Sequence, residues 1–248
     1  MASGSRTVRR LNFGTCYVIE PIEIHKATIV WLHDLDHIGR RCLEPLKDLN
    51  LPSIKWICPT APRLPVTSLA GQNATAWCDI TKVSESMQHD FESLDSVNSY
   101  VADLLSTEPT NVIKGVGGVG LGAAAALYFA SSCAFGKVQI KQQMINPQIV
   151  IGINGWLPGL TSLQPNMNNA FGTFNRAKLQ RILLLHGTSD DVVPSEFGYK
   201  CAVSLRNNEF PTMFKQCGGY KHRLILSLSL SFFFYIFSDF RLSFAAIM

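Results

Sequence analysis

The glycine-rich turn Gly118-Val119-Gly120-Leu121-Gly122 has the spacing of the G-x-S-x-G nucleophile motif of hydrolases, but a glycine stands at its centre. In that motif a strained strand-to-helix turn exposes a serine oxygen, a histidine activates it, and backbone N–H groups hold the developing oxyanion. Gly120 has no side-chain oxygen. The surroundings of the turn therefore predict nucleophilic ester hydrolysis, while its central residue lacks the attacking group.

Two further residues have the types and the chain order that a catalytic triad requires. Asp190 follows the apolar run Arg181–His186. His222 follows the next such run, Thr212–Cys217. Because α/β sheets build their sites at the carboxyl ends of parallel strands, we expect both side chains at one edge of the sheet. Each residue taken alone also fits an ordinary turn or surface position.

Residues 115–120 also match G-x-G-x-x-G, which binds dinucleotides when it joins a strand to a helix. Such a site needs an acidic side chain about 20 residues further on to hold the ribose hydroxyls. Between Glu108 and Asp190 the chain has no Asp or Glu, and the residues at that distance are basic or amide side chains such as Lys137. Only a variant that binds a 2′-phosphate would remain, so the hydrolase interpretation is favoured.

Length and composition describe one large globular α/β domain. The chain has 248 residues, of which 47% are hydrophobic and 16% charged, and no linker divides it. The net charge of +4 is small, and the densest basic group, Arg6 to Arg10, lies at one terminus, which argues against nucleic-acid binding.

The cysteines and the first residues favour a cytoplasmic protein. Seven cysteines, an odd number without C-x-x-C spacing, suit reduced thiols and give no zinc site. Residues 1–14 have no apolar core of a secretory signal.

Apolar, β-branched runs alternate with helical patterns, which predicts a mostly parallel sheet with helices on both faces. The expected strands are Thr15–Ile19, Ala27–Leu32, Ile54–Ile57, Val112–Val116, Gln148–Ile153, Arg181–His186 and Thr212–Cys217. The expected helices are Arg40–Asn50, Phe91–Ser106, Leu121–Ser132 and Phe197–Asn208. Prolines and turn residues predict one long loop from Pro59 through Pro65 and on to Asn73.

The motifs together resemble those of the acyl-protein thioesterase and lysophospholipase-like carboxylesterases of the α/β-hydrolase superfamily, and those of plant members most. Residues 32–39 are similar to the family's L-H-G-L-G-D-T-G loop, and residues 58–80 to its C-P-x-A-P, P-V-T and A-W-F-D-I segments. Residues 117–125 resemble its G-G-F-S-x-G-A-A turn, and residues 186–194 its H-G-x-x-D-x-V-V-P loop. The similarity runs from about Ala27 to His222.

This resemblance implies an α/β-hydrolase fold and a cytosolic serine hydrolase that cleaves thioesters of acylated proteins, or small carboxylic and lysophospholipid esters. It implies Asp190 and His222 as triad partners of the missing nucleophile. It also implies the backbone N–H groups of Leu35 and Leu121 as oxyanion donors. No cofactor and no metal ion is expected.

The chain departs from the family at four positions besides its end. Gly120 replaces the nucleophile, Asp34 and Asp36 replace both glycines of the oxyanion loop, and Lys221 replaces the glycine before the histidine. Carboxylates that face the site would repel an oxyanion, whereas side chains that point into solvent would not. These departures predict an impaired enzyme.

Three alternatives follow from the missing serine. Ser131, Ser132 and Cys133 cannot replace it, because 11 to 13 residues along a helix place them roughly 16 to 20 Å away. A water molecule with His222 as its base could attack directly. A non-catalytic protein could instead bind an acyl chain or an acylated protein in a retained pocket, for which the expected lining residues are Trp77 and Trp156.

The domain is expected to span residues 1–222 without the family's final helix, followed by an atypical apolar tail at 223–248. Leu224 to Phe237 carry no charge, but 14 residues are too few to cross a bilayer, which needs about 20. Membrane contact through the tail is therefore expected to be weak at most. An aberrant C-terminus is the simplest interpretation.

Overall fold

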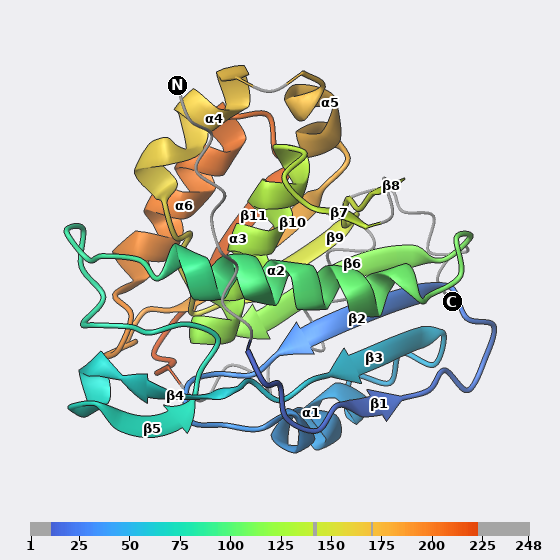
Figure 1. Ribbon diagram of the computed structural model, residues 1–248, viewed down its shortest axis with the longest axis horizontal. Helices are drawn as coiled ribbons and strands as arrows, with labels where there is room; N and C mark the ends of the chain where they lie inside the picture. Colours follow the sequence, from blue (N-terminus) through green and yellow to red (C-terminus); the bar gives the residue numbers. More distant parts are fainter. Residues whose placement is uncertain (1–10, 141–142, 170, 223–248) are drawn as a thin grey trace.

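A seven-stranded sheet forms the centre of the protein (Figure 1). The computed structural model describes residues 11–140, 143–169 and 171–222. The strand order is β1-β3-β2-β6-β9-β10-β11, and every neighbouring pair is parallel except β1 with β3. The strands are β1 (Tyr17–Ile19), β2 (Ala27–Leu32), β3 (Ile54–Cys58), β6 (Ile113–Val119), β9 (Ile149–Ile153), β10 (Arg181–Gly187) and β11 (Thr212–Cys217). All seven expected runs form strands, which confirms the predicted α/β fold.

Helices pack on both faces of this sheet. They are η1 (Gly39–Cys42), α1 (Leu43–Lys47), α2 (Phe91–Ser106), α3 (Leu121–Ala134), η3 (Leu160–Ser162), α4 (Leu163–Asn169), α5 (Thr173–Lys178) and α6 (Ser195–Asn207). α2, α3 and α6 contribute to one buried cluster with Val30, Val116 and Leu184 of the sheet, and Figure 1 shows α2 lying across β6 and β2. η1 and α1 contribute to a second cluster, on the opposite face, with Trp31 and Trp56.

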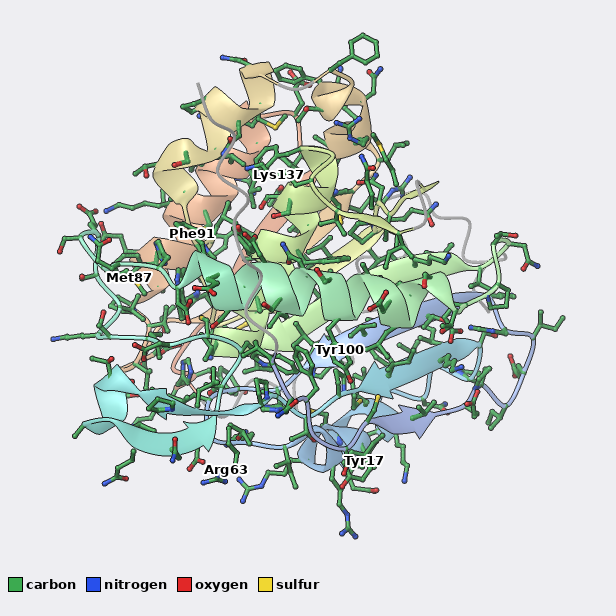
Figure 2. The ribbon with its side chains drawn as sticks, viewed as in Figure 1. Tyr17, Arg63, Met87, Phe91, Tyr100 and Lys137 are labelled. Atoms are coloured by element: carbon green, nitrogen blue, oxygen red, sulfur yellow. The ribbon has the colours of Figure 1, made fainter. Side chains whose placement is uncertain are left out.

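The helix α2 spans the residues expected from its apolar periodicity. It begins after Asp90, because the Oδ1 atom of Asp90 accepts a hydrogen bond from the backbone N–H of Ser93 at 3.1 Å. On its outer side Tyr100, labelled in Figure 2, stacks on Phe13 with ring centroids 3.8 Å apart. The segment around Phe13 is thereby fixed against α2, the helix that covers the central strands.

Two expected elements differ from the structure. The predicted helix Arg40–Asn50 is replaced by the short η1 and α1, and Asn50 has a left-handed φ of 48° that ends the helical path. The predicted long loop contains a hairpin of β4 (Arg63–Val66) and β5 (Gln72–Thr75), joined by η2 (Thr67–Leu69). Pro65 fits there because β4 belongs to a separate two-stranded sheet, and it is one of the exposed residues that alternate with buried ones along this strand.

Two short strands were not part of the predicted pattern. β7 (Gln139–Ile140) and β8 (Gln143–Met144) have two residues each, too few to show an alternating pattern. The expected apolar tail at 223–248 and the missing final helix lie outside the described residues. None of the helices in the described ranges is both long and apolar enough to cross a membrane.

The turn between β6 and α3 is packed tightly against the neighbouring strand β2. A Cβ atom on Gly122 would overlap the carbonyl oxygens of Leu32 and His33, and one on Gly118 would also overlap Leu32. Backbone oxygens within a sheet cannot move aside as a flexible side chain can. The two outer glycines of the motif therefore allow α3 to begin directly against the end of β2.

We expect Gly122→Ala to lower the free energy of unfolding by roughly 1–3 kcal/mol, because the added methyl group overpacks a rigid backbone contact. Chemical denaturation monitored by circular dichroism measures this loss. Gly218→Ala is the matched control, since nothing lies within 4 Å of its added Cβ. Equal stability of the two variants would contradict the packing argument.

Candidate active site

The turn that should carry a nucleophile has the backbone of a strained elbow. Gly120 lies between β6 and α3 with φ 54° and ψ −117°, a conformation that residues with a side chain rarely adopt. Its N–H donates to the Ile153 carbonyl at 2.9 Å, which fixes the turn to β9. Gly115 and Gly117 lie within β6 and not in a loop. A dinucleotide site requires these glycines in a phosphate-binding turn, so the structure argues against the dinucleotide interpretation.

Asp190 and His222 meet at the carboxyl ends of β10 and β11. The Nδ1 atom of His222 donates to Asp190 Oδ2 at 2.8 Å. The other carboxylate oxygen of Asp190 accepts hydrogen bonds from the backbone N–H groups of Val192 and Val193, at 2.9 and 2.8 Å. The two residues proposed from their order in the chain are therefore hydrogen-bonded as a triad requires.

The carboxylate of Asp34 fills the site beside this pair. Its Oδ1 atom accepts from the backbone N–H groups of Leu35 and Leu121, at 2.8 and 3.0 Å. Its Oδ2 atom lies 3.2 Å from His222 Nε2. The two expected oxyanion donors thus converge on one point, and a side chain of the protein already occupies that point.

Of the two carboxylates that replace loop glycines, only Asp34 enters the site. Asp36 is exposed and has a left-handed φ of 55°, the backbone geometry that a glycine at this position adopts without strain. The possibility that both side chains point into solvent is therefore wrong for Asp34 and holds for Asp36.

Asp34 also occupies the space of the missing serine side chain. A Cβ atom added to Gly120 would overlap both Oδ1 and Cγ of Asp34, and it would lie 2.9 Å from His222 Nε2. A serine at position 120 and the observed position of Asp34 therefore exclude each other.

His33 and Trp77 hold the loop that carries Asp34. His33 Nε2 accepts from the Ala61 N–H at 2.9 Å, so its Nδ1 carries the proton and donates to the Asp34 carbonyl at 2.7 Å. Burial lowers the pKa of His33 to about 4, which keeps this imidazole neutral. The Nε1 atom of Trp77 donates to the His33 carbonyl at 2.8 Å. Trp77 is fully buried and positions the loop, whereas a place in the substrate pocket was expected for it.

The three charged groups of the site stabilise one another. Burial alone would lower the pKa of His222, but its hydrogen bonds and charge interactions with Asp190 and Asp34 outweigh burial and raise the pKa to about 9. Burial would raise the pKa of Asp34, but the imidazole of His222 and the two backbone N–H groups lower it. Burial would also raise the pKa of Asp190, but hydrogen bonds from His186 and His222 outweigh burial and hold this pKa well below its usual range. At neutral pH the site therefore holds an imidazolium between two carboxylates.

A small apolar pocket opens beside Asp34 and His222. Its volume is about 210 Å³, and Trp156 contributes to its wall as expected from the sequence. The other lining residues are Leu35, Asp36, Leu69, Ile80, Val83, Leu121, Val192 and Val193. Asp34, Asp36 and His222 are thus the ionisable side chains of a pocket whose walls are mostly aliphatic.

The family model described as phospholipase/carboxylesterase matches residues 14–227. The chain belongs to this family. An acyl-protein thioesterase 1 homologue of Dictyostelium discoideum is 28% identical over 210 residues, which cover 79% of this chain and 85% of that protein. Acyl-protein thioesterase 1 of Cryptococcus neoformans is 30% identical over 192 residues, with 73% and 74% covered.

The crystal structure of Zea mays acyl-protein thioesterase 2 is similar to this structure, with a TM-score of 0.83 and 37% sequence identity. The match covers 90% of this chain and 99% of that one. The predicted family and fold, including the likeness to plant members, are thereby confirmed.

Asn154 was missed by the sequence analysis. This buried residue has a φ of 53°, donates from Nδ2 to the His222 carbonyl at 2.8 Å, and accepts from the Gly187 N–H at 2.9 Å. It therefore links the segments that carry His222 and Asp190. Its position directly after a buried strand was the available signal. Within the described ranges, no group of three or more His, Cys, Asp or Glu side chains has an arrangement that could hold a metal ion.

We expect the His222 pKa of about 9 to fall in Asp34→Asn, because one of the two carboxylates that raise it is lost. Titration of the His222 ring proton by NMR measures both values. The stability that this ion pair contributes is complete below pH 6.5 and is lost as the pH rises through about 9, and Asp34→Asn should lose less over that interval. An unchanged His222 pKa in the variant would contradict the pairing.

Proposed function

We propose that this protein is a catalytically impaired hydrolase of acyl esters or thioesters, in which Asp34 occupies the place of the reacting acyl group. The single observation that carries this proposal is the Asp34 carboxylate bound to the N–H groups of Leu35 and Leu121. A carbonyl substrate needs those two donors for its own oxygen when the tetrahedral intermediate forms. As long as the carboxylate stays, no second oxygen can be held there.

The substrate class in this proposal comes from the relatives and from the pocket. The similar proteins of Dictyostelium discoideum, Cryptococcus neoformans and Zea mays are named acyl-protein thioesterases. The mostly aliphatic walls of the pocket suit an acyl chain better than a charged ligand. We therefore propose acylated proteins or small acyl esters as the ligands of this site. The seven free cysteines support a cytoplasmic location.

Three features of the site act against ester hydrolysis. Position 120 offers no side-chain oxygen, and loss of the nucleophile from a complete triad lowers turnover by about 2 × 10⁶. The oxyanion donors are occupied by Asp34. His222, with a pKa of about 9, is protonated at neutral pH and cannot accept a proton from water. The third feature also argues against direct attack by water.

We expect a fluorophosphonate probe to leave the wild-type protein and Gly120→Ser unlabelled, because the new serine overlaps Asp34. The double variant Asp34→Gly/Gly120→Ser should become labelled, since it has a nucleophile, an open oxyanion site and a less strongly paired histidine. In-gel fluorescence of the purified, folded proteins measures labelling. Asp34→Gly alone is the matched control and should remain unlabelled, because it still has no serine at position 120.

Labelling of the wild type would contradict the loss of the nucleophile. Equal labelling of Gly120→Ser and the double variant would show that Asp34 does not block the site.

A second candidate function is acyl binding without turnover, which the apolar pocket beside an occupied oxyanion site favours. We expect the wild type to bind a short acyl ester in this pocket, and Asp34→Gly to bind a short fatty acid more tightly, because its carboxylate can then reach the two freed N–H groups. Isothermal titration calorimetry measures both affinities. Absence of binding by either protein would exclude this role.

A further inference from the structure

The Asp34 carboxylate combines two positions that a serine hydrolase divides between enzyme and substrate. Its Oδ2 atom, 3.2 Å from His222 Nε2, stands where a serine oxygen would be activated by the imidazole. Its Oδ1 atom, bound to the N–H groups of Leu35 and Leu121, stands where the oxyanion of an acyl intermediate would lie. The site therefore contains an ionised oxygen nucleophile, a histidine–aspartate pair and two oxyanion donors.

This arrangement suits an alkyl carbon and does not suit a carbonyl carbon. Attack on a carbonyl places negative charge on the substrate oxygen, which then needs the donors that Asp34 occupies. Displacement at a saturated carbon creates no such oxyanion, and carboxylates are established nucleophiles in covalent catalysis. The filled site that prevents ester hydrolysis is compatible with displacement at a saturated carbon.

We propose that Asp34 is the nucleophile of a hydrolase that opens small apolar epoxides to diols. Each ring nitrogen of the resting His222 faces a carboxylate, Nδ1 that of Asp190 and Nε2 that of Asp34, so Nε2 carries a proton. A leaving oxygen that departs as an alkoxide needs such a proton, which favours a strained epoxide over an alkyl halide as the substrate. The pocket volume of about 210 Å³ limits the substrate to a small molecule. The mostly aliphatic walls of the pocket favour an apolar substrate.

In the first step Asp34 Oδ2 attacks a ring carbon of the epoxide. A carbon–oxygen bond forms to Asp34 as the carbon–oxygen bond of the ring breaks. The ring oxygen takes up the proton that His222 gives up, either directly or through solvent at the open side of the pocket. The products of this step are a hydroxyalkyl ester on Asp34 and a neutral imidazole.

The second step regenerates the site. Esterification removes the negative charge of Asp34, one of the two charges that keep His222 protonated, so the neutral imidazole can now accept a proton from water. The resulting hydroxide attacks Asp34 Cγ, and the charge develops on Oδ1, already bonded to the two backbone N–H groups. Cleavage of the Cγ–Oδ2 bond releases the diol, whose new alkoxide takes the proton of the added hydroxyl. Asp34 returns as a carboxylate and His222 as an imidazolium.

The oxygen balance of this sequence gives a decisive test. One diol oxygen comes from the epoxide and the other from Asp34 Oδ2, whereas the oxygen of water stays in the Asp34 carboxylate. With the full-length protein in excess over styrene oxide in ¹⁸O-water, we expect a single turnover to label the peptide that contains Asp34 and to leave the diol unlabelled. Mass spectrometry of the digested protein and of the diol measures both. An acid quench before completion should reveal that peptide with the mass of one added epoxide.

Asp34→Asn should lose both the peptide adduct and diol formation, because the amide that replaces the carboxylate carries no charge. Asp191→Asn removes the exposed carboxylate next to Asp190 and should keep both. Circular dichroism establishes that the variants are folded, and the isotope experiment on the wild type needs no variant. Label in the diol and not in Asp34, or no diol from the wild type, would overturn the proposal. The fluorophosphonate result is independent of these outcomes, because it tests only the serine-type site.

Discussion

The hydrogen-bonded charge cluster of Asp34, His222 and Asp190 is the interaction on which the rest of the site depends. A carboxylate within a mostly apolar pocket is costly unless it is paired and hydrogen-bonded. Both oxygens of Asp34 have partners here, two backbone N–H groups for one and an imidazolium for the other. These contacts fill the oxyanion site and, together with those from Asp190, raise the pKa of His222, so the Asp34 side chain contributes to both the shape and the charge of the centre.

The glycine at position 120 and the position of the Asp34 carboxylate depend on each other for steric reasons. The space that a side chain at position 120 would take is the space that the Asp34 carboxylate occupies. The backbone of the elbow is fixed by β6, by the hydrogen bond from the Gly120 N–H to Ile153 and by the close approach of Gly122 to β2. The fold therefore preserves the positions of a hydrolase site while the groups at those positions differ. The oxyanion donors are not free to bind a carbonyl substrate, because they hold a carboxylate that can itself act as a nucleophile.

Much of the fold was predictable because the signals are local. Strands buried on both faces are continuous apolar runs, and α2 repeats its apolar residues at helical spacing, so these elements were expected within a few residues. The β4–β5 hairpin was missed because its prolines predicted a loop, although a two-stranded sheet tolerates Pro65. Trp77 was placed in the pocket, but its indole N–H instead holds the loop that carries Asp34, a contact that spans 44 positions of the chain.

The sequence by itself determined that position 120 has no side-chain oxygen, that an aspartate and a histidine follow the last two strands, and that carboxylates stand where the family's loop has glycines. Only the tertiary structure decided that the Asp34 carboxylate is hydrogen-bonded within the site, whereas Asp36 is exposed. Residue types in a loop do not reveal side-chain direction when the partner is distant, and the Leu121 N–H that holds Asp34 is 87 residues away along the chain. The folded backbone brings that donor and His222 to the same carboxylate. The two unusual residues, Asp34 and Gly120, therefore belong to one site.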